Sequence, residues 1–203
     1  MDDKIFNLDE KKRISIINSA MEEFSKNTYE QASTNRIVKG AGISKGSLFN
    51  YFKSKKALYD YLKVFSVEEI ANTIVEKVNW EEPDLLNRVS EITMIKMDIL
   101  RKYPHLLGFT KRINSYSSIE DLKMIYGAYV PNLYEKVYSE NIDFSLFRED
   151  IDIKAAMNIL IWTFEKLGEN YFNRIRVGEK IDVDEMAHDV DIYIGILRKG
   201  FYK

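Results

Sequence analysis

The segment from residue 33 to residue 56, STNRIVKGAGISKGSLFNYFKSKK, carries the side chains best suited to specific chemistry. It contains six basic residues and no acidic one: Arg36, Lys39, Lys45, Lys53, Lys55 and Lys56. A surface with this charge pattern can bind a polyanion such as nucleic acid. The same residues could instead form the solvated basic face of a small helical unit, so charge alone leaves both interpretations open.

The apolar residues of this segment predict two short helices joined by a tight turn. Gly42 can take the positive φ that the turn needs, and Ala41 lets the two helices approach closely. The second helix, over residues 44–51, would expose small and polar side chains: Lys45, Gly46, Ser47 and Asn50. Such side chains suit the floor of a DNA major groove, with basic and hydroxyl groups beside them for the phosphates.

Residues 41–62, AGISKGSLFNYFKSKKALYDYL, resemble the signature of the TetR family of bacterial transcriptional regulators, whose usual form is close to AGVSKGTLYHYFKSKEEL. The similarity extends over about residues 8–62 and covers turn, core and exposed positions together. The resemblance implies an N-terminal three-helix DNA-binding domain. It also implies a larger helical domain that binds a small molecule and dimerises, usually in a repressor.

Carried over by position, the resemblance implies two groups of DNA contacts. Base edges would be read by Lys45, Gly46, Ser47 and Asn50. The sugar-phosphate backbone would be held by Ser33, Thr34, Tyr51 and Lys55. The chain departs from the family at Phe49, where a Tyr often contacts a phosphate, so Tyr51 is the better aromatic candidate. Gly46 could also serve only close packing.

Composition and charge describe the whole chain as one helical globular protein of 203 residues with no Cys, which excludes thiol chemistry and disulfides. Residues 1–62 hold 11 basic and 8 acidic residues, and residues 63–203 hold 19 and 24, so the first third is basic and the rest acidic. No apolar stretch is long enough for a signal peptide or a membrane span, and we therefore expect a cytoplasmic protein.

Apolar positions three and four apart predict an all-α fold of about nine helices, and no stretch alternates as a strand would. Ser33, Ser44 and Ser54 can cap helices, and the last two helices can be capped by Asp150 or Asp152 and by Asp182 or Asp184. The expected organisation is a helix-turn-helix domain over residues 1–53 and a helical ligand-binding and dimerisation domain over residues 54–203. The expected helices cover residues 8–24, 33–41, 44–51, 54–78, 83–103, a short stretch after 104, and 118–140. Two more run from 150 or 152 to 175 and from 182 or 184 to about 200.

The second domain is rich in Tyr and Met, which predicts an adaptable, mainly apolar pocket for a largely apolar or aromatic effector. Glu165 interrupts an apolar run, and a charge there is costly unless it meets a partner, a ligand or solvent. The candidate ligand-binding residues are Met97, Tyr103, Tyr126, Tyr129, Trp162 and Glu165.

The remaining patterns predict no catalytic residues, no metal and no cofactor. His188 could join Asp184 and Glu185 in a metal site, but a solvated helix start explains the same residues more simply. We therefore predict a homodimeric repressor, paired through the apolar helices after residue 150, that a small molecule releases from a palindromic operator. The alternatives are a helical protein-interaction module or a small-molecule enzyme without DNA binding.

Overall fold

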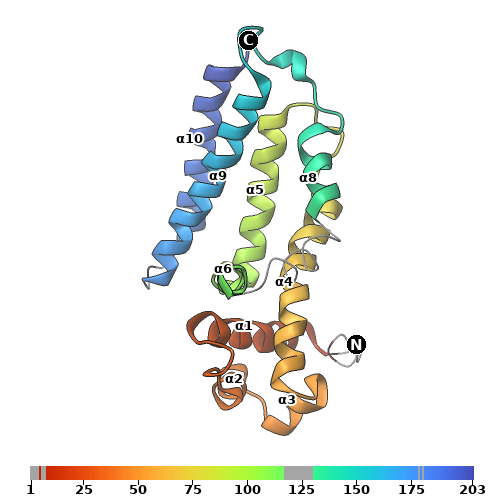
Figure 1. Cartoon of the computed structure of the whole chain (residues 1–203), viewed down its shortest axis with the longest axis vertical. Helices are drawn as coiled ribbons and strands as arrows, with labels where there is room; N and C mark the ends of the chain where they lie inside the picture. Colours follow the sequence, from red (N-terminus) through yellow and green to blue (C-terminus); the bar gives the residue numbers. More distant parts are fainter. Residues whose placement is uncertain (1–4, 6–7, 117–129, 178, 180) are drawn as a thin grey trace. The chain divides into compact units, whose positions relative to one another are not determined.

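The computed structural model describes residues 5, 8–116, 130–177, 179 and 181–203, and it is all-helical over these residues, with no β-strand (Figure 1). The predicted all-α fold is confirmed. The helices are α1 (Glu10–Lys26), α2 (Thr34–Ala41), α3 (Lys45–Phe52), α4 (Lys55–Lys77), α5 (Leu85–Lys102), α6 (Leu106–Tyr116), α8 (Val130–Ser139), the short 3-10 helix η2 (Phe144–Leu146), α9 (Ile153–Arg176) and α10 (Val183–Phe201). None of these helices is both long and apolar enough to cross a membrane.

Side-chain caps set where several helices begin. The Ser44 hydroxyl accepts the Ser47 amide at 3.0 Å, the Ser54 hydroxyl accepts the Ala57 amide at 3.0 Å, and Asp152 and Asp182 cap α9 and α10 in the same way. These bonds satisfy first-turn amides that have no partner inside the helix. Ser33 stands at the N-cap of α2 without making a side-chain cap bond, so the prediction that its hydroxyl caps this helix is wrong.

The described residues belong to two compact units, and α4 and α5 contribute to both. Unit 1 comprises residues 1–72 and 98–130, and unit 2 comprises residues 73–97 and 131–203. The predicted domain boundary after residue 53 differs from this division, because Leu58 and Leu62 of α4 are fully buried and the ring of Phe109 in α6 lies 6.3 Å from that of Phe24 in α1. The functional boundary remains a prediction.

In unit 1, α1 packs closely against α2. A Cβ atom added at Gly40 would lie 2.4 Å from the Ser19 hydroxyl oxygen, and that hydroxyl is already held by a 2.7 Å bond to the Ile37 carbonyl. A Cβ atom would fit at this crossing only if the Ser19 side chain moved. Gly42 then ends α2 with φ +66°, a conformation that other residues adopt reluctantly. The predicted turn of the helix-turn-helix is confirmed.

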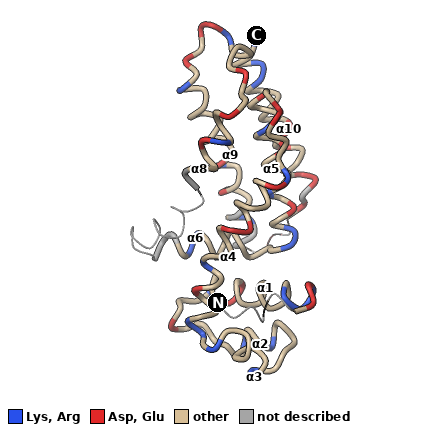
Figure 2. Tube along the Cα trace, turned by 90° about the vertical axis from the view of Figure 1, so that its right-hand side faces the viewer, with Lys and Arg blue, Asp and Glu red and all other residues tan. Residues whose placement is uncertain are grey.

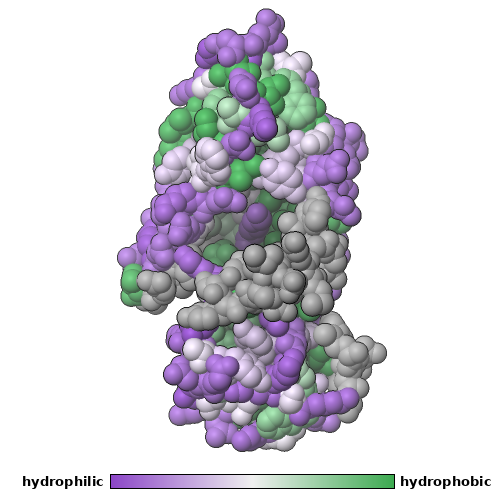
Figure 3. All heavy atoms as spheres, in the orientation of Figure 1, coloured by the Kyte–Doolittle hydropathy of each residue, from purple (hydrophilic) through white to green (hydrophobic). Residues whose placement is uncertain are grey.

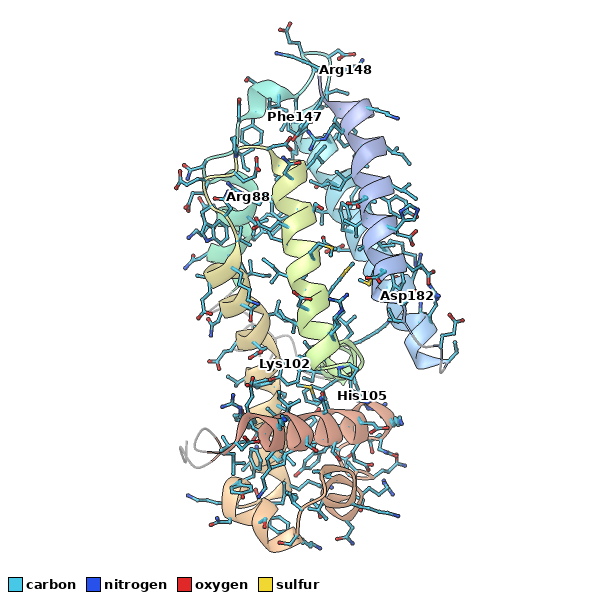
Figure 4. The ribbon with its side chains drawn as sticks, turned by 180° about the vertical axis from the view of Figure 1, so that it is seen from behind. Arg88, Lys102, His105, Phe147, Arg148 and Asp182 are labelled. Atoms are coloured by element: carbon cyan, nitrogen blue, oxygen red, sulfur yellow. The ribbon has the colours of Figure 1, made fainter. Side chains whose placement is uncertain are left out.

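Unit 2 has its own apolar core, formed mainly by α5, α9 and α10. A fully buried guanidinium, that of Arg88 on α5, lies beside this core (Figure 4). It donates to the carbonyls of Trp80 at 2.9 Å and of Glu82 before α5, and to those of Lys136 and Glu140 at the end of α8. Backbone carbonyls thus replace the water that the buried charge has lost, and Arg88 ties the end of α8 to the segment that precedes α5.

Candidate nucleic-acid interface

The eight-residue helix α3 has one buried side and one exposed side. Leu48 and Phe52 are buried in unit 1, whereas Lys45, Gly46 and Asn50 are exposed. Helical spacing explains this division, because residues four apart share a face. The predicted exposure is confirmed for these three positions, and their contact with DNA remains a prediction.

Ser47 is half-buried and belongs partly to the cap of α3. Its hydroxyl oxygen lies 2.9 Å from that of Ser44, and its amide donates to the same Ser44 oxygen. A base contact by Ser47 would therefore share a hydroxyl that already supports the start of the helix. Tyr51, one turn further along the helix, is half-buried.

Gly46 is an exposed helical position that does not need to be glycine for packing. A Cβ atom there would meet nothing closer than the Ser44 hydroxyl oxygen at 3.8 Å, which is ordinary contact. Close packing within this chain, the alternative reading of this residue, is therefore not supported. Glycine in a helix costs up to about 1 kcal/mol relative to alanine, so its presence here fits a demand from outside the chain, such as close approach of another molecule to the helix.

The buried carboxylate of Glu23 fixes the start of α2 through hydrogen bonds. Glu23 of α1 accepts two nitrogens of the Arg36 guanidinium and, at 2.8 Å, the amide of Ser33. The Arg36 hydrogen bond is the main reason that the pKa of Glu23 lies below its ordinary value, and burial acts against it. Ser33 and Thr34, two of the predicted backbone contacts, are half-buried at this end of the helix.

Figure 2 marks the Lys and Arg residues along the chain. Those of residues 33–56 differ in how available their charge is. Arg36 is paired with Glu23, and Lys56 is paired with Asp60 at 2.5 Å. Lys39 and Lys45 are exposed and have no ion-pair partner among the residues that the structure describes. Of these two, Lys45 stands in the first turn of α3, so this helix begins with an accessible positive charge.

Lys55 has partners that the sequence did not suggest. Its ammonium donates to the carbonyls of Tyr29 at 2.7 Å, Ala32 at 3.0 Å and Glu30 at 3.3 Å, and it lies 4.6 Å from the centre of the Tyr29 ring. An ammonium has three hydrogens, so these three acceptors use all of its donors. A phosphate contact from Lys55, as predicted, would require some of these bonds to break.

The four predicted ligand-binding residues that the structure describes have different surroundings, and their role in binding remains a prediction. Met97 is buried in the core of unit 2, whereas Tyr103 is buried in unit 1 against Phe65, with ring centres 5.2 Å apart. Trp162 is 62% exposed on α9, and Glu165 is also exposed. Tyr126 and Tyr129 lie outside the described residues. Met97 thus packs in the core of unit 2, Tyr103 packs in unit 1, and Trp162 lies on the surface of α9.

One charged residue of unit 2 was missed. Lys96 on α5 is exposed to solvent, yet the protein around it lowers its pKa by desolvation, while Glu165 acts in the opposite direction. Burial is the main cause that raises the pKa of Tyr138 on α8 to about 12, and the negative charge of Glu165 raises it further. Lysine recurs on many exposed helix faces, so its type and spacing alone could not mark this position.

The residues considered for a metal site are used otherwise. Glu185 accepts the Arg174 guanidinium at 2.8 Å, and Asp184 lies in the first turn of α10. Over the part of the chain that the structure describes, no three His, Cys, Asp or Glu side chains gather in a way that could hold a metal ion.

Comparison with known proteins points to one family. Residues 16–62, which run from α1 into α4, match the family described as "Bacterial regulatory proteins, tetR family". The chain is 23% identical over 163 residues to the "Fatty acid metabolism regulator protein" of Bacillus subtilis (strain 168), covering 76% of this chain and 80% of that protein. It is 26% identical over 155 residues to the "Biofilm operon icaADBC HTH-type negative transcriptional regulator IcaR" of Staphylococcus aureus (strain Newman), covering 70% and 83%.

A solved structure shows the same fold over nearly the whole chain. It is the transcriptional regulator FadR from Bacillus subtilis in complex with stearoyl-CoA, with a TM-score of 0.54 at 20% identity. The match covers 92% of this chain and 98% of that one. The similarity therefore includes the helices of unit 2 and is not confined to the helix-turn-helix.

Substituting the two glycines of the helix-turn-helix separates packing from surface approach. We expect Gly46→Ala to raise the melting temperature, because alanine fits and favours the helix by up to about 1 kcal/mol. We expect the same change to weaken DNA binding, because a methyl group would stand between the helix and the DNA. Thermal denaturation and a DNA-binding titration measure the two effects.

The matched control is Gly40→Ala, whose Cβ would meet the Ser19 hydroxyl oxygen at 2.4 Å. It should lower stability by about 1–3 kcal/mol, the usual cost of overpacking. The interpretation of Gly46 would be wrong if Gly46→Ala destabilised the protein or bound DNA as tightly as the unchanged chain.

Proposed function

Residues 16–62 match the tetR family of bacterial regulatory proteins, and we propose that the chain belongs to this family and is a ligand-responsive repressor that binds a palindromic operator as a homodimer. The observation that carries the proposal is the exposed face of α3. This face combines an accessible Lys45, a glycine that packing does not require and the polar Asn50 on a helix whose other side is buried. Such a helix fits a major groove.

On this proposal the residues of unit 1 divide into two sets. Lys45, Gly46, Ser47 and Asn50 read base edges, which choose the sequence. Ser33, Thr34 and Tyr51 hold the sugar-phosphate backbone, which fixes the register of the protein on the duplex. Action on the chromosome implies a cytoplasmic protein. A helical interaction module or an enzyme would require neither set.

An apolar surface on the last two helices supports the homodimer. Large apolar side chains are exposed three and four residues apart on α9 and α10: Ile159, Trp162, Ile192, Tyr193 and Ile196. Apolar residues reach the surface on the side of unit 2 where these helices lie (Figure 3). Monomers rarely expose many large apolar side chains together, and a second copy related by a twofold axis would cover those of α9 and α10. Ile194, in contrast, is buried in the core of its own chain.

The effector is proposed from the surroundings of Lys96. Lys96 is exposed, and within the part of the chain that the structure describes its ammonium has no hydrogen-bonded partner, so it is available to the acidic head group of an otherwise apolar ligand. Glu165 and Tyr138 would complete the polar end of this site. The relatives support this class of effector, since one is named as a fatty acid metabolism regulator and a solved structure of the same fold holds stearoyl-CoA. The negative regulator among them supports repression.

Lys45 tests the DNA interface. If Lys45 reads a base edge, Lys45→Ala should cost about 1–3 kcal/mol of binding free energy and relax the preference at one operator position. The operator would be selected from the DNA upstream of the coding sequence and from random duplexes, and affinity measured by fluorescence anisotropy. Lys26→Ala removes an exposed lysine that is paired with Glu22 on α1 and should change neither quantity. Equal losses on operator and random DNA would contradict base reading by Lys45.

Ile196 tests the dimer. It is 61% exposed on α10, so Ile196→Asp should leave the fold of each chain intact and place a charge in the proposed interface. Sedimentation should then show monomers with weak operator binding and unchanged helical content. Val177→Asp alters a 73% exposed apolar residue outside that apolar surface and should remain dimeric. A monomeric unchanged chain that binds a palindrome tightly would contradict the proposal.

Lys96 tests the effector site, with stearoyl-CoA as the probe. We expect the probe to weaken operator binding by the unchanged chain, and Lys96→Met to reduce this response without changing operator affinity in its absence. Lys154→Met, an exposed lysine on α9, is the control and should respond as the unchanged chain does. An identical response of Lys96→Met would exclude Lys96 from the site.

A further inference from the structure

Lys55 stands where a positive charge is unfavourable unless something compensates it. It is the first residue of α4, and the partial positive charge of a helix N-terminus disfavours a cation there. The three carbonyls of Tyr29, Glu30 and Ala32 provide that compensation, and the Tyr29 ring lies against the ammonium. A lysine in this place is therefore explained without a ligand.

The carbonyls that bind Lys55 belong to the loop between α1 and α2. This loop leads directly into Ser33 and Thr34, the start of α2. On its other side the loop is held by Glu23 of α1, which accepts the Ser33 amide at 2.8 Å. The start of α2 is thus fixed both by a carboxylate from α1 and by an ammonium from α4.

Lys55 is also rigidly connected to α3. Only Lys53 and Ser54 separate the last residue of α3 from Lys55, and Lys53 adopts φ +57°, a conformation that few non-glycine residues take. The Ser54 hydroxyl caps α4 through the Ala57 amide at 3.0 Å. Because this connection is short and specific, the bonds of Lys55 relate the start of α2 to the end of α3.

We propose that Lys55 is a positioning residue, which sets the spacing between the start of α2 and the reading helix α3 and does not contact a DNA phosphate. This inference rests on the proposed DNA binding. It reverses the role that the family resemblance implies for this lysine. The side chains that Lys55 positions are Ser33 and Thr34 on one side and Tyr51 on the other.

The test compares Lys55→Met with Lys56→Met on the selected operator over a range of salt concentrations. Both variants remove one positive charge from the first turn of α4, and methionine preserves the apolar stem. A phosphate contact contributes about 0.9 to the slope of log affinity against log salt. We expect Lys55→Met to bind roughly tenfold more weakly, which is about 1.4 kcal/mol of binding free energy, because the start of α2 would no longer be held in place, and we expect the slope to be unchanged. Lys56→Met should bind as the unchanged chain does.

Two measurements without DNA complete the test. Amide hydrogen exchange in residues 29–34 should become faster in Lys55→Met and not in Lys56→Met, and Lys55→Arg, which keeps donors for the carbonyls, should restore both slow exchange and affinity. If Lys55→Met does not fold at the binding temperature, Lys55→Gln replaces it. A slope reduced by about 0.9 with unchanged exchange would overturn the proposal in favour of a phosphate contact.

The outcomes also separate this inference from the proposed function. If the unchanged chain binds no DNA, the proposed function fails, and the exchange data alone decide whether Lys55 holds the loop. If the chain binds DNA and Lys55→Met changes neither affinity nor exchange, the positioning role is wrong while the proposed function stands.

Discussion

The carboxylate of Glu23 is the interaction on which the DNA-facing part of unit 1 depends. It is 7% exposed, and it joins α1, the loop and α2 through Arg36, the Ser33 amide and Asn27. A buried carboxylate is costly unless its oxygens are fully hydrogen-bonded, and this one has donors from three parts of the chain. Because α2 is held in this way, the Gly42 turn can present α3 with its polar side outward. Lys55 of α4 binds carbonyls of the same loop, so the carboxylate of Glu23 and the ammonium of Lys55 both fix the loop between α1 and α2.

The helix-turn-helix could be predicted because its determinants are local. Gly42, the Ser44 cap and the buried Leu48 lie within seven residues of one another, and each has a conformational preference that sequence reveals. Glu23 and Lys55 could not be predicted in the same way, since their partners lie 13 and between 23 and 26 residues away. Periodicity says nothing about pairs at such separations. Counting Arg36, Lys55 and Lys56 as accessible charge was therefore an overestimate.

In unit 2 the helices could be predicted more accurately than the faces they bury. The apolar pattern placed α9 and α10 within a few residues of their observed bounds. These helices carry apolar residues on more than one side, so the sequence could not tell the buried Ile194 from the exposed Ile196 two positions later. Trp162 is exposed for the same reason, although tryptophan is usually largely buried. Arg88 is the opposite case, because it is charged and yet fully buried. The backbone carbonyls of Glu82, before α5, and of Glu140, after α8, accept hydrogen bonds from its guanidinium.

The pairing of cations inside unit 1 affects how such a regulator would choose its site. Affinity for DNA of any sequence grows with the number of phosphates that a protein neutralises. Here Arg36, Lys55 and Lys56 are engaged within the protein, and the residues after 62 carry a net negative charge. Both features limit attraction to random DNA. On the proposed function, discrimination then depends on whether the face of α3 fits the groove, where the small Gly46 would permit close approach and Lys45 is accessible. The spacing of α2 and α3 matters for the same reason, because a base edge can be read only when the backbone contacts hold the helix in register.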